Sequence, residues 1–312
     1  MERMLAALRQ WAPGMPLDTI RSALATTGTA AGVAVAAAAK VCEEHRLRDL
    51  TPELVEAFTA LGAPKHDPGC RGRIAIVHAL HALDHWADEV FTAGLSIVQR
   101  VGSPTAPDDE AAPLRGACAL AHAHFLRPEA VDVCAEMLAD AWIAARIGAA
   151  RGLGDSGRTD ATAVLRYKLV LATDDGDVLA ACFDALFALD REGAIAFSRK
   201  LLGFADERAD AAALALGGNR ASVAIDDLIG WCRTCGPRRR QRVGYVALAL
   251  LRHDAANAVL AQAIAEERAP EALAAATALA TFRDEASTAE LLRAAAAKQR
   301  DRQLRAELLA LV

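Results

Sequence analysis

Apolar residues recur along the chain with the spacing of amphipathic helices. The segments that begin at Ala130 and Ala224 both have apolar side chains at positions i, i+3, i+4 and i+7, which places those side chains on one helix face. Pro52, Pro68 and Pro270 each follow a turn and stand where the first turn of a helix accepts proline. The pattern therefore predicts a chain built from helices rather than strands.

A two-helix pattern repeats along most of the sequence. Each repeat has a turn rich in Asp, Gly or Pro, an Ala-rich helix that ends in Ala-Leu or a close variant, and a second helix with larger apolar residues. The late leucines of the Ala-rich helices have a mean spacing of about 33 residues, which suits helix pairs. These leucines are Leu80, Leu120, Leu153, Leu189, Leu216, Leu250, Leu279 and Leu311. We therefore predict an all-α fold, a right-handed α-solenoid (superhelix) of about eight helix pairs.

The turns set the boundaries of the predicted elements. We expect an N-terminal helical cap over residues 1–28 and one continuous repeat array over residues 29–312. The first pair is predicted at residues 29–45 and 52–61, later pairs begin near Pro68, Pro113, Asp140, Asp175, Glu207, Arg238 and Pro270, and a last helix covers residues 301–312. The stretch 102–110 is expected to be a loop inserted into the array. Gly62, Gly154 and the pair Gly217-Gly218 are expected to cap helix ends in the left-handed conformation.

The composition agrees with closely packed helices. Hydrophobic residues make up 54% and charged residues 24% of the chain, which is typical of a globular protein. Alanine accounts for 75 of the 312 residues; its small side chain lets neighbouring helices approach, and it favours helix formation. Aromatic residues make up only 4%, which argues against an all-β fold because strands are rich in aromatic and β-branched residues.

Charge, cysteines and apolar segments restrict the environment and the partners. The net charge of −5 and the pI of about 5.9 argue against a general nucleic-acid binder, which usually carries a basic face. The seven cysteines, an odd number scattered through apolar helical stretches, predict free buried thiols in a reducing compartment. The sequence has neither a secretory signal nor an apolar stretch of the roughly 20 residues that span a membrane. We therefore expect a cytoplasmic protein without membrane contact.

Three stretches carry a family resemblance. Asp67-Pro68-Gly69-Cys70-Arg71 leads to Ala79-Leu80, Asp140 is followed by Arg146, Ala149, Ala150, Leu153 and Gly154, and a third stretch covers Ala211–Gly217. They resemble HEAT repeats, in particular the short type of the phycobilisome lyases, and the N-terminal part resembles uncharacterised bacterial HEAT-repeat proteins. The resemblance implies an array of HEAT-like helix pairs in which the second helix of each pair lines a concave binding surface.

This arrangement implies a bacterial, non-catalytic interaction scaffold. We expect a protein or peptide partner on the concave face and no cofactor, and we expect Gln99 to be exposed there. The predicted contact residues are Arg100, Arg166, Lys168, Arg199 and Lys200. Two alternatives stay open: a phycobilin-lyase-like chromophore lyase or accessory protein, and a HEAT-like nucleic-acid-binding or DNA-repair protein, which the acidic balance disfavours. No Gly-rich phosphate loop, nucleophile elbow or zincin motif predicts an enzyme.

Histidine is concentrated in one region. His78, His81 and His85 have the spacing i, i+3 and i+7 of one helix face, and imidazoles arranged in this way bind transition metals. We favour the alternative that they fill semi-polar positions between stacked helices, because the spacing supplies no full ligand set. His122 and His124, in the equivalent helix of the next repeat, are two residues apart and should point in different directions. Deoxyhypusine hydroxylase, a HEAT-like iron enzyme, uses His-Glu dipeptides, and this chain has none.

Two further motifs lie close together in the sequence. Cys232 and Cys235 form a lone CxxC that lacks the second pair of a structural zinc site and the preceding strand of a redox motif. We therefore expect two thiols at a helix end. The basic run Arg238–Arg242 is a candidate phosphate contact. We favour a solvated helix start, paired with Asp226, Asp227, Glu266 or Glu267, because charge runs usually face solvent.

Overall fold

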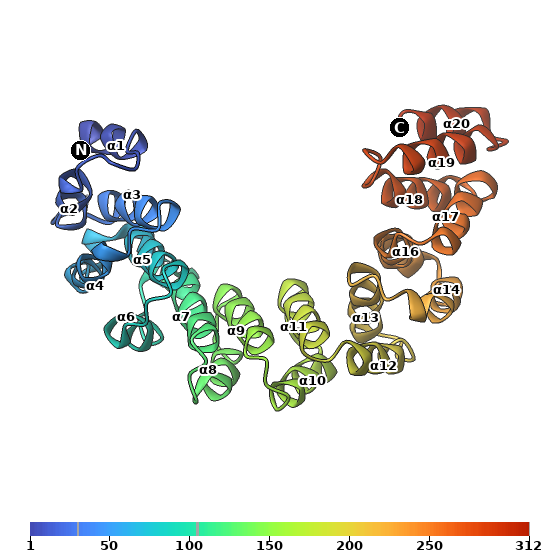
Figure 1. Cartoon of the computed structure of the whole chain (residues 1–312). Coiled ribbons are helices and arrows are strands. Elements are labelled where there is room, and N and C mark those ends of the chain that lie inside the picture. Colours follow the sequence, from blue (N-terminus) through green and yellow to red (C-terminus); the bar gives the residue numbers. More distant parts are fainter. Residues whose placement is uncertain (30, 104–105, 312) are drawn as a thin grey trace. The chain divides into compact units, whose positions relative to one another are not determined.

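Two compact units make up the chain, in a computed structural model that describes residues 1–29, 31–103 and 106–311. Unit 1 covers residues 1–165 and unit 2 covers residues 166–312. Within each unit the helices stack in two layers, one formed by the first helices of successive pairs and one by the second helices (Figure 1). The all-α fold of stacked helix pairs is therefore confirmed.

Unit 1 begins with two short helices, α1 (Glu2–Arg9) and α2 (Asp18–Leu24), which pack against the first helix of the array. The first helices of its pairs are α3 (Ala31–Glu44), α5 (Arg71–Ala82), α7 (Ala112–His124) and α9 (Ile143–Asp155). The second helices are α4 (Thr51–Ala60), α6 (Asp88–Gly94) and α8 (Ala130–Met137), while α10 (Ala161–Leu171) contains the boundary between the units. Short 3₁₀ turns, η1 (Arg48–Leu50), η2 (Pro64–His66) and η3 (Pro68–Cys70), precede α4 and α5.

Unit 2 continues the same pattern with helix pairs and a terminal helix. The pairs are α11 (Gly176–Leu189) with α12 (Arg191–Leu201), α13 (Glu207–Gly218) with α14 (Ile225–Thr234), α16 (Tyr245–Leu251) with α17 (Asp254–Glu266), and α18 (Ala269–Ala280) with α19 (Ala286–Ala297). The last helix is α20 (Arg302–Leu309). The 3₁₀ turn η4 (Ser222–Ala224) precedes α14, and α15 (Pro237–Arg239) and the π-helical turn η5 (Arg240–Gly244) run directly into α16.

Glycine allows the first helices of unit 1 to approach at backbone distance. A Cβ atom added to Gly148 on α9 would lie 2.5 Å from the carbonyl carbon and oxygen of Gly116 on α7. A Cβ atom added to Gly72 on α5 would lie 3.1 Å from the Cα atom of Gly32 on α3. Because glycine has no Cβ, it leaves room for the neighbouring backbone. The small-residue composition therefore produces a tightly packed layer of first helices, as the alanine content predicts.

The helix boundaries agree with the sequence prediction in order and differ by a few residues in position. The pair predicted at residues 29–45 and 52–61 corresponds to α3 and α4, and Val312, at the end of the last predicted helix, lies outside the described residues. The division into a cap over residues 1–28 and a single array over residues 29–312 stays a prediction. Across the described ranges, no helix combines the length and the apolar character that crossing a membrane requires.

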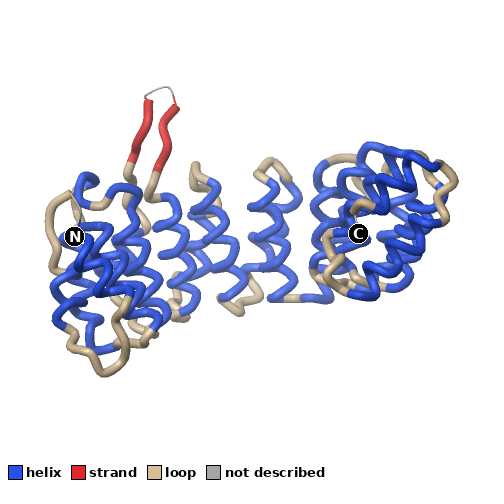
Figure 2. The backbone as a smooth tube through the Cα atoms, turned by 90° about the horizontal axis from the view of Figure 1, so that it is seen from above, coloured by secondary structure: helices blue, strands red, loops and turns tan. Residues whose placement is uncertain are grey.

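The stretch predicted as an inserted loop forms a two-stranded antiparallel ribbon instead. β1 (Arg100–Ser103) pairs with β2 (Ala106–Asp109), with Arg100 opposite Asp109, and the ribbon extends beyond the helix ends of unit 1 (Figure 2). Pro104 and Thr105 of the predicted loop lie outside the described residues. The sequence concealed these strands because Gly, Pro and Asp are rare in strands.

Buried charges hold the base of this ribbon. Asp109 is 3% exposed; its Oδ1 accepts a hydrogen bond from the backbone N–H of Gln99 at 2.8 Å, and its Oδ2 lies 2.6 Å from Nη1 of Arg115 on α7. Arg115 also donates to both carboxylate oxygens of Asp140, at 2.8 and 3.0 Å. The prediction that Gln99 is exposed is wrong: it is 3% exposed, and its Nε2 donates to the carbonyl oxygen of Asp67 at 2.9 Å.

An aspartate and an arginine six residues apart recur at the start of three first helices of unit 1. The three pairs are Asp67 with Arg73, Asp109 with Arg115, and Asp140 with Arg146. In the first, the carboxylate accepts hydrogen bonds from the N–H of Gly72 at 2.8 Å and of Arg73 at 3.1 Å, which satisfies the open end of α5. Asp67 thus satisfies the start of a helix and also faces the guanidinium of Arg73, with 3.5 Å between Oδ2 and Nε.

The glycines that were predicted to cap helices do not take the left-handed conformation. Gly154 lies inside α9, Gly217 and Gly218 lie inside α13, and Gly62 has no positive φ. Residues other than glycine have positive φ after the first helices instead: Arg46, Asp84, Leu126, Arg220 and Arg252. In these five turns the backbone takes this conformation with side chains that disfavour it, at a cost of about 1–2 kcal/mol per residue.

Candidate functional site

Two of the predicted contact residues lie on α10 and form ion pairs within unit 2. Nη2 of Arg166 lies 3.4 Å from Oδ2 of Asp190, the residue that caps α12. Nζ of Lys168 lies 2.6 Å from Oδ2 of Asp174, just after the same helix. Both cations are partly buried, so a carboxylate of their own unit already compensates each charge.

The other three predicted contact residues lie on different elements. Arg199 on α12 pairs with Asp227 on α14, with 2.7 Å between Nε and Oδ2, and therefore connects two successive second helices. Lys200 is its exposed neighbour, and Arg100 is exposed at the start of β1 in unit 1. The five residues belong to three elements, and their role as partner contacts stays a prediction.

The histidine region of unit 1 differs from the predicted single helix face. α5 ends three residues before His85, and Asp84 is left-handed with φ 53°, so His85 leaves the face that it was predicted to share with His78 and His81. His81 instead packs against His124 on α7, with the ring centroids 4.0 Å apart. Nε2 of His124 lies 3.3 Å from Oδ1 of Asp84, and Nε2 of His81 is buried without a hydrogen-bond partner.

This environment suits packing rather than metal binding. Burial lowers the pKa of His81, and the neighbouring imidazoles of His124 and His78 lower it further. His122 is 2% exposed, its Nδ1 lies 2.9 Å from the carbonyl oxygen of Cys118, and His124 is exposed, so these two point in different directions as predicted. Within the described ranges, no group of three or more His, Cys, Asp or Glu side chains is placed to hold a metal ion.

The CxxC and the basic run meet around the π-helical turn of unit 2. Cys232 and Cys235 are free thiols at the end of α14, the first buried and the second half-buried. Nε of Arg240 donates to the carbonyl oxygen of Cys232 at 2.8 Å. Nε of Arg239 lies 2.7 Å from Oδ1 of Asp210 on α13. Neighbouring groups therefore hold part of the run, and the carboxylates that pair with it are Asp210 and Glu271 rather than the predicted Asp226, Asp227, Glu266 or Glu267.

A cavity of about 490 Å³, here called the apolar cavity, opens between α11, α13 and η5 in unit 2. Large apolar side chains from all these elements and from α16 line it: Leu179, Phe183, Leu214, Val243 and Leu250. Phe183 is 1% exposed and forms the floor, whereas Leu214 is 36% exposed and stands at the mouth. Sequence reasoning missed these residues because they belong to first helices, which were assigned to the core.

α11 and α13 have no close glycine contact beside the apolar cavity. Gly176 and Gly218 lie at the cavity, and a Cβ atom added to either would meet no heavy atom within 4 Å. A Cβ atom added to Gly217, by contrast, would collide with the carbonyl oxygen of Ala247 on α16 and lie 3.0 Å from its carbonyl carbon. α13 therefore packs tightly against α16 and loosely against α11.

Carboxylates dominate the rim of the apolar cavity. The ionisable side chains that line it are Asp174, Asp184, Glu207, Asp210 and Arg242. Four carboxylates and one arginine give this lining a net charge of −3. Oδ1 of Asp184 accepts a hydrogen bond from Nδ2 of Asn219 at 3.1 Å, and Glu207 is exposed. Burial raises the pKa of Asp210, an effect that the guanidinium groups of Arg239 and Arg242 oppose.

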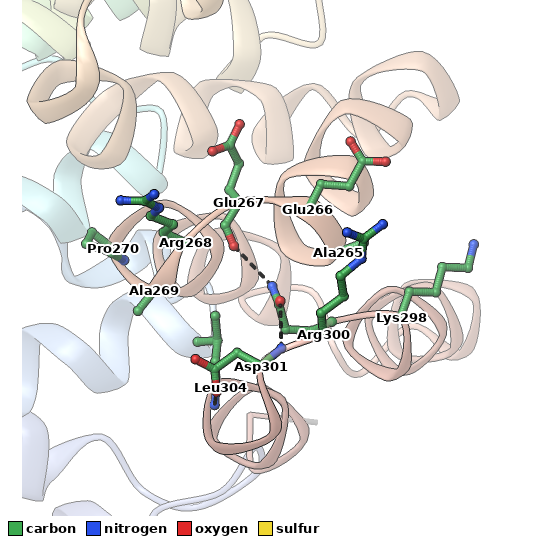
Figure 3. Close-up of a pocket in the computed structure, with 11 residues that line it drawn as sticks. Ala265, Glu266, Glu267, Arg268, Ala269, Pro270, Lys298, Arg300, Asp301 and Leu304 are labelled. Atoms are coloured by element: carbon green, nitrogen blue, oxygen red, sulfur yellow. Dashed lines mark hydrogen bonds between the residues drawn. The ribbon is translucent and has the colours of Figure 1, made fainter.

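A polar cavity of about 880 Å³ lies near the ends of α17 and α19 in the same unit (Figure 3). The buried Gln299 side chain holds its walls together: Nε2 donates to the carbonyl oxygen of Glu267 at 3.1 Å, and Oε1 accepts from the N–H of Asp301 at 3.3 Å. Its lining contains three carboxylates and three cations, so their charges balance and favour no ligand charge.

Comparison with known proteins leaves the family open. No protein-family model and no curated protein matches the sequence. Among solved structures, the complex of CpcE and CpcF of phycocyanin lyase from Nostoc sp. PCC7120 is similar to 73% of this chain and to 94% of that chain, with 19% sequence identity and a TM-score of 0.37. At that identity and TM-score, the likeness assigns neither an activity nor a ligand to this chain.

Proposed function

We propose that this protein is a non-catalytic interaction scaffold that binds a segment of a partner protein in the apolar cavity of unit 2. The observation that carries the proposal is the open space between α11 and α13, with Phe183 at its floor and Leu214 at its mouth. Binding pockets are concave, mostly apolar and bordered by a few polar groups, with volumes of about 300–1,000 Å³. The apolar cavity has this size and this lining.

The polar groups at the rim support recognition rather than chemistry. Asp174 is paired with Lys168, Asp184 accepts from Asn219, and Asp210 is paired with Arg239. A carboxylate held in this way can accept a partner's hydrogen bond, but it is poorly suited to act as a general base. The net negative lining also opposes a polyanion such as nucleic acid. The chromophore-lyase and nucleic-acid alternatives stay predictions from the sequence.

The test fills the cavity without disturbing the core. Gly218 is the last residue of α13 and borders open space, so tryptophan there enters the cavity, whereas alanine leaves most of it open. A phage library of random peptides of about twelve residues is selected on the purified full chain, and enriched peptides are synthesised and titrated by fluorescence anisotropy. We expect wild-type affinity for Gly218→Ala and an affinity lower by roughly tenfold or more for Gly218→Trp, a loss of about 1.4 kcal/mol.

The control places the same bulk elsewhere in unit 2. Gly230 on α14 also borders open space and does not line the apolar cavity, so Gly230→Trp should bind the peptides like the wild type. Circular dichroism spectra should show that all three variants keep the helical fold. Failure to enrich any peptide, or equal binding by Gly218→Trp and the wild type, would overturn the proposed function.

A further inference from the structure

The apolar cavity continues into a second hollow of about 650 Å³ at the basic run. Glu207, Asp210 and Arg242 line both, so the two form one continuous groove in unit 2. Arg238 and Arg239 line only the second hollow, together with the half-buried thiol of Cys235. We call this part of the groove the arginine end.

The π-helical turn distributes the basic run between two sides. Arg240 turns away from the groove, because its Nε donates to the carbonyl oxygen of Cys232 and its Nη2 to that of Arg233 at 2.7 Å. Arg238, Arg239 and Arg242 line the groove. π-Helical turns are rare and occur frequently at functional sites, because the wider turn changes the direction of the side chains that follow.

Charge is separated along the groove. Asp210 and Arg239 neutralise each other between the two ends. Asp184 lines only the apolar cavity and the exposed Arg238 lines only the arginine end, while the exposed Glu207 and Arg242 line both, so the ionisable side chains sum to −3 at the apolar cavity and +1 at the arginine end. In the part of the chain that the structure describes, no carboxylate forms an ion pair with either of these two arginines. The groove is therefore negative at its apolar end and positive at the other.

We propose that this groove binds a peptide segment with charges of opposite sign on the two sides of a large apolar residue. The proposal rests on the function proposed above and adds the chemistry of the partner. The apolar side chain fills the apolar cavity, a basic side chain meets Asp184 and Glu207, and an acidic side chain meets Arg238 and Arg242. A partner that matches both ends gains affinity and a fixed direction, because reversing it places like charges together.

A peptide fits this groove better than a nucleic acid or a small anion does. The arginine end alone would attract phosphate, but carboxylates line the same groove and repel any ligand that is negative along its whole length. A chain segment can present an apolar group and both charges at once. The electrostatic contacts are exposed to solvent, so the affinity should fall with ionic strength.

The experiment reverses the charge of the arginine end and measures whether the charge that the peptide prefers there reverses as well. Peptides enriched on the wild-type chain should contain a large apolar residue with Lys or Arg on one side and Asp or Glu on the other. Arg238→Glu with Arg242→Glu should weaken a synthetic peptide of this kind by roughly tenfold, because two exposed ion pairs become repulsive. A peptide with its acidic residues exchanged for lysine should regain affinity for this variant. Arg233→Glu with Arg300→Glu changes the net charge equally outside the groove and should leave binding unchanged.

Cys235 reports where the peptide lies. It is half-buried at the arginine end while the other six cysteines are buried, so a bound peptide should slow its alkylation by iodoacetamide. Some peptides could bind Gly218→Trp more weakly than the wild type but bind the Arg238→Glu, Arg242→Glu variant as tightly as the wild type. That result would overturn the proposal of a peptide with two opposite charges and would leave the proposed function standing. Enriched peptides without the two charges, or an unchanged alkylation rate at saturation, would overturn it equally.

Discussion

Two glycine-to-alanine exchanges in unit 2 should change its stability in opposite directions. Gly217 on α13 and Gly230 on α14 both lie within helices, and they differ in what surrounds them. A Cβ atom at Gly230 would meet no heavy atom within 4 Å, whereas one at Gly217 would collide with the backbone of Ala247. Both exchanges replace a poor helix former by the best one, which favours the helix by about 1 kcal/mol.

The expected magnitudes follow from the space around each Cβ atom. Nothing opposes the helix preference at Gly230, so Gly230→Ala should raise the free energy of unfolding of unit 2 by about 0.5–1 kcal/mol. At Gly217 the new atom would lie 3.0 Å from the carbonyl carbon of Ala247 and closer still to its oxygen, whereas ordinary contacts begin at 3.4 Å. α13 and α16 must therefore separate, and overpacking of this kind costs about 1–3 kcal/mol or more. We expect Gly217→Ala to lower the free energy of unfolding by about 2 kcal/mol after the helix preference is subtracted.

Urea denaturation followed by circular dichroism measures these changes, and hydrogen exchange locates them. Because the chain has two units whose unfolding need not coincide, peptides from α13 and α16 should report the change while peptides from α3 and α5 should not. If Gly217→Ala proves as stable as Gly230→Ala, backbone contact between first helices is not what holds the layer together.

Three further predictions concern unit 1. Arg115→Met should lower its free energy of unfolding by about 3–5 kcal/mol at pH 7, measured in urea, because it leaves the carboxylate of Asp109 buried without its cation. Burial alone would raise the pKa of Asp109, but hydrogen bonds from the Gln99 N–H and from Arg115 hold it below the ordinary 3.8. The ion pair of Asp109 and Arg115 should therefore stabilise the wild type fully above about pH 4, and this stabilisation should be lost as the pH falls through the pKa of Asp109 in the folded chain. Burial and the adjacent His124 lower the pKa of His81 below 6.5, so at acid pH the unfolded chain binds more protons than the folded chain does. The melting temperature should therefore decrease as the pH is lowered from 6.5, and this decrease should be smaller in His81→Phe. Leu126 is left-handed (φ 52°) and 75% exposed, so Leu126→Gly should raise the free energy of unfolding by about 0.5–1 kcal/mol while Leu126→Ala should not.

Local spacing was sufficient to predict the helix pairs, because each helix carries its own pattern. The apolar positions that begin at Ala130 form α8, and the prolines at positions 52 and 270 lie in the first turns of α4 and α18. The ribbon at residues 100–109 could not be predicted in this way, because its base is stabilised by the contact of Asp109 with Arg115 rather than by strand preference. The left-handed turn at Leu126 was missed for a similar reason: the geometry of the pair imposes it on a residue that disfavours it.

The candidate site was harder to predict because it depends on contacts between repeats. Arg166 and Arg199 were selected as exposed cations on second helices, but their carboxylate partners, Asp190 and Asp227, lie in the next repeat. A single sequence cannot show which acid meets which base across that distance. One signal for the apolar cavity was present: Leu214 is a large residue in the stretch Ala211–Gly217, where a layer of small side chains was expected.

Small residues determine where the first helices close and where they leave space. α7 and α9 meet through Gly116 and Gly148, where their backbones approach closely. α11 contributes Leu179 and Phe183 to the cavity that it borders with α13, and large side chains keep helices apart unless a third element fills the gap. η5 also borders this cavity, and Leu214 stays exposed beside it. A binding site in such a stack can therefore arise without any dedicated motif, wherever the close contact between two neighbouring first helices is missing.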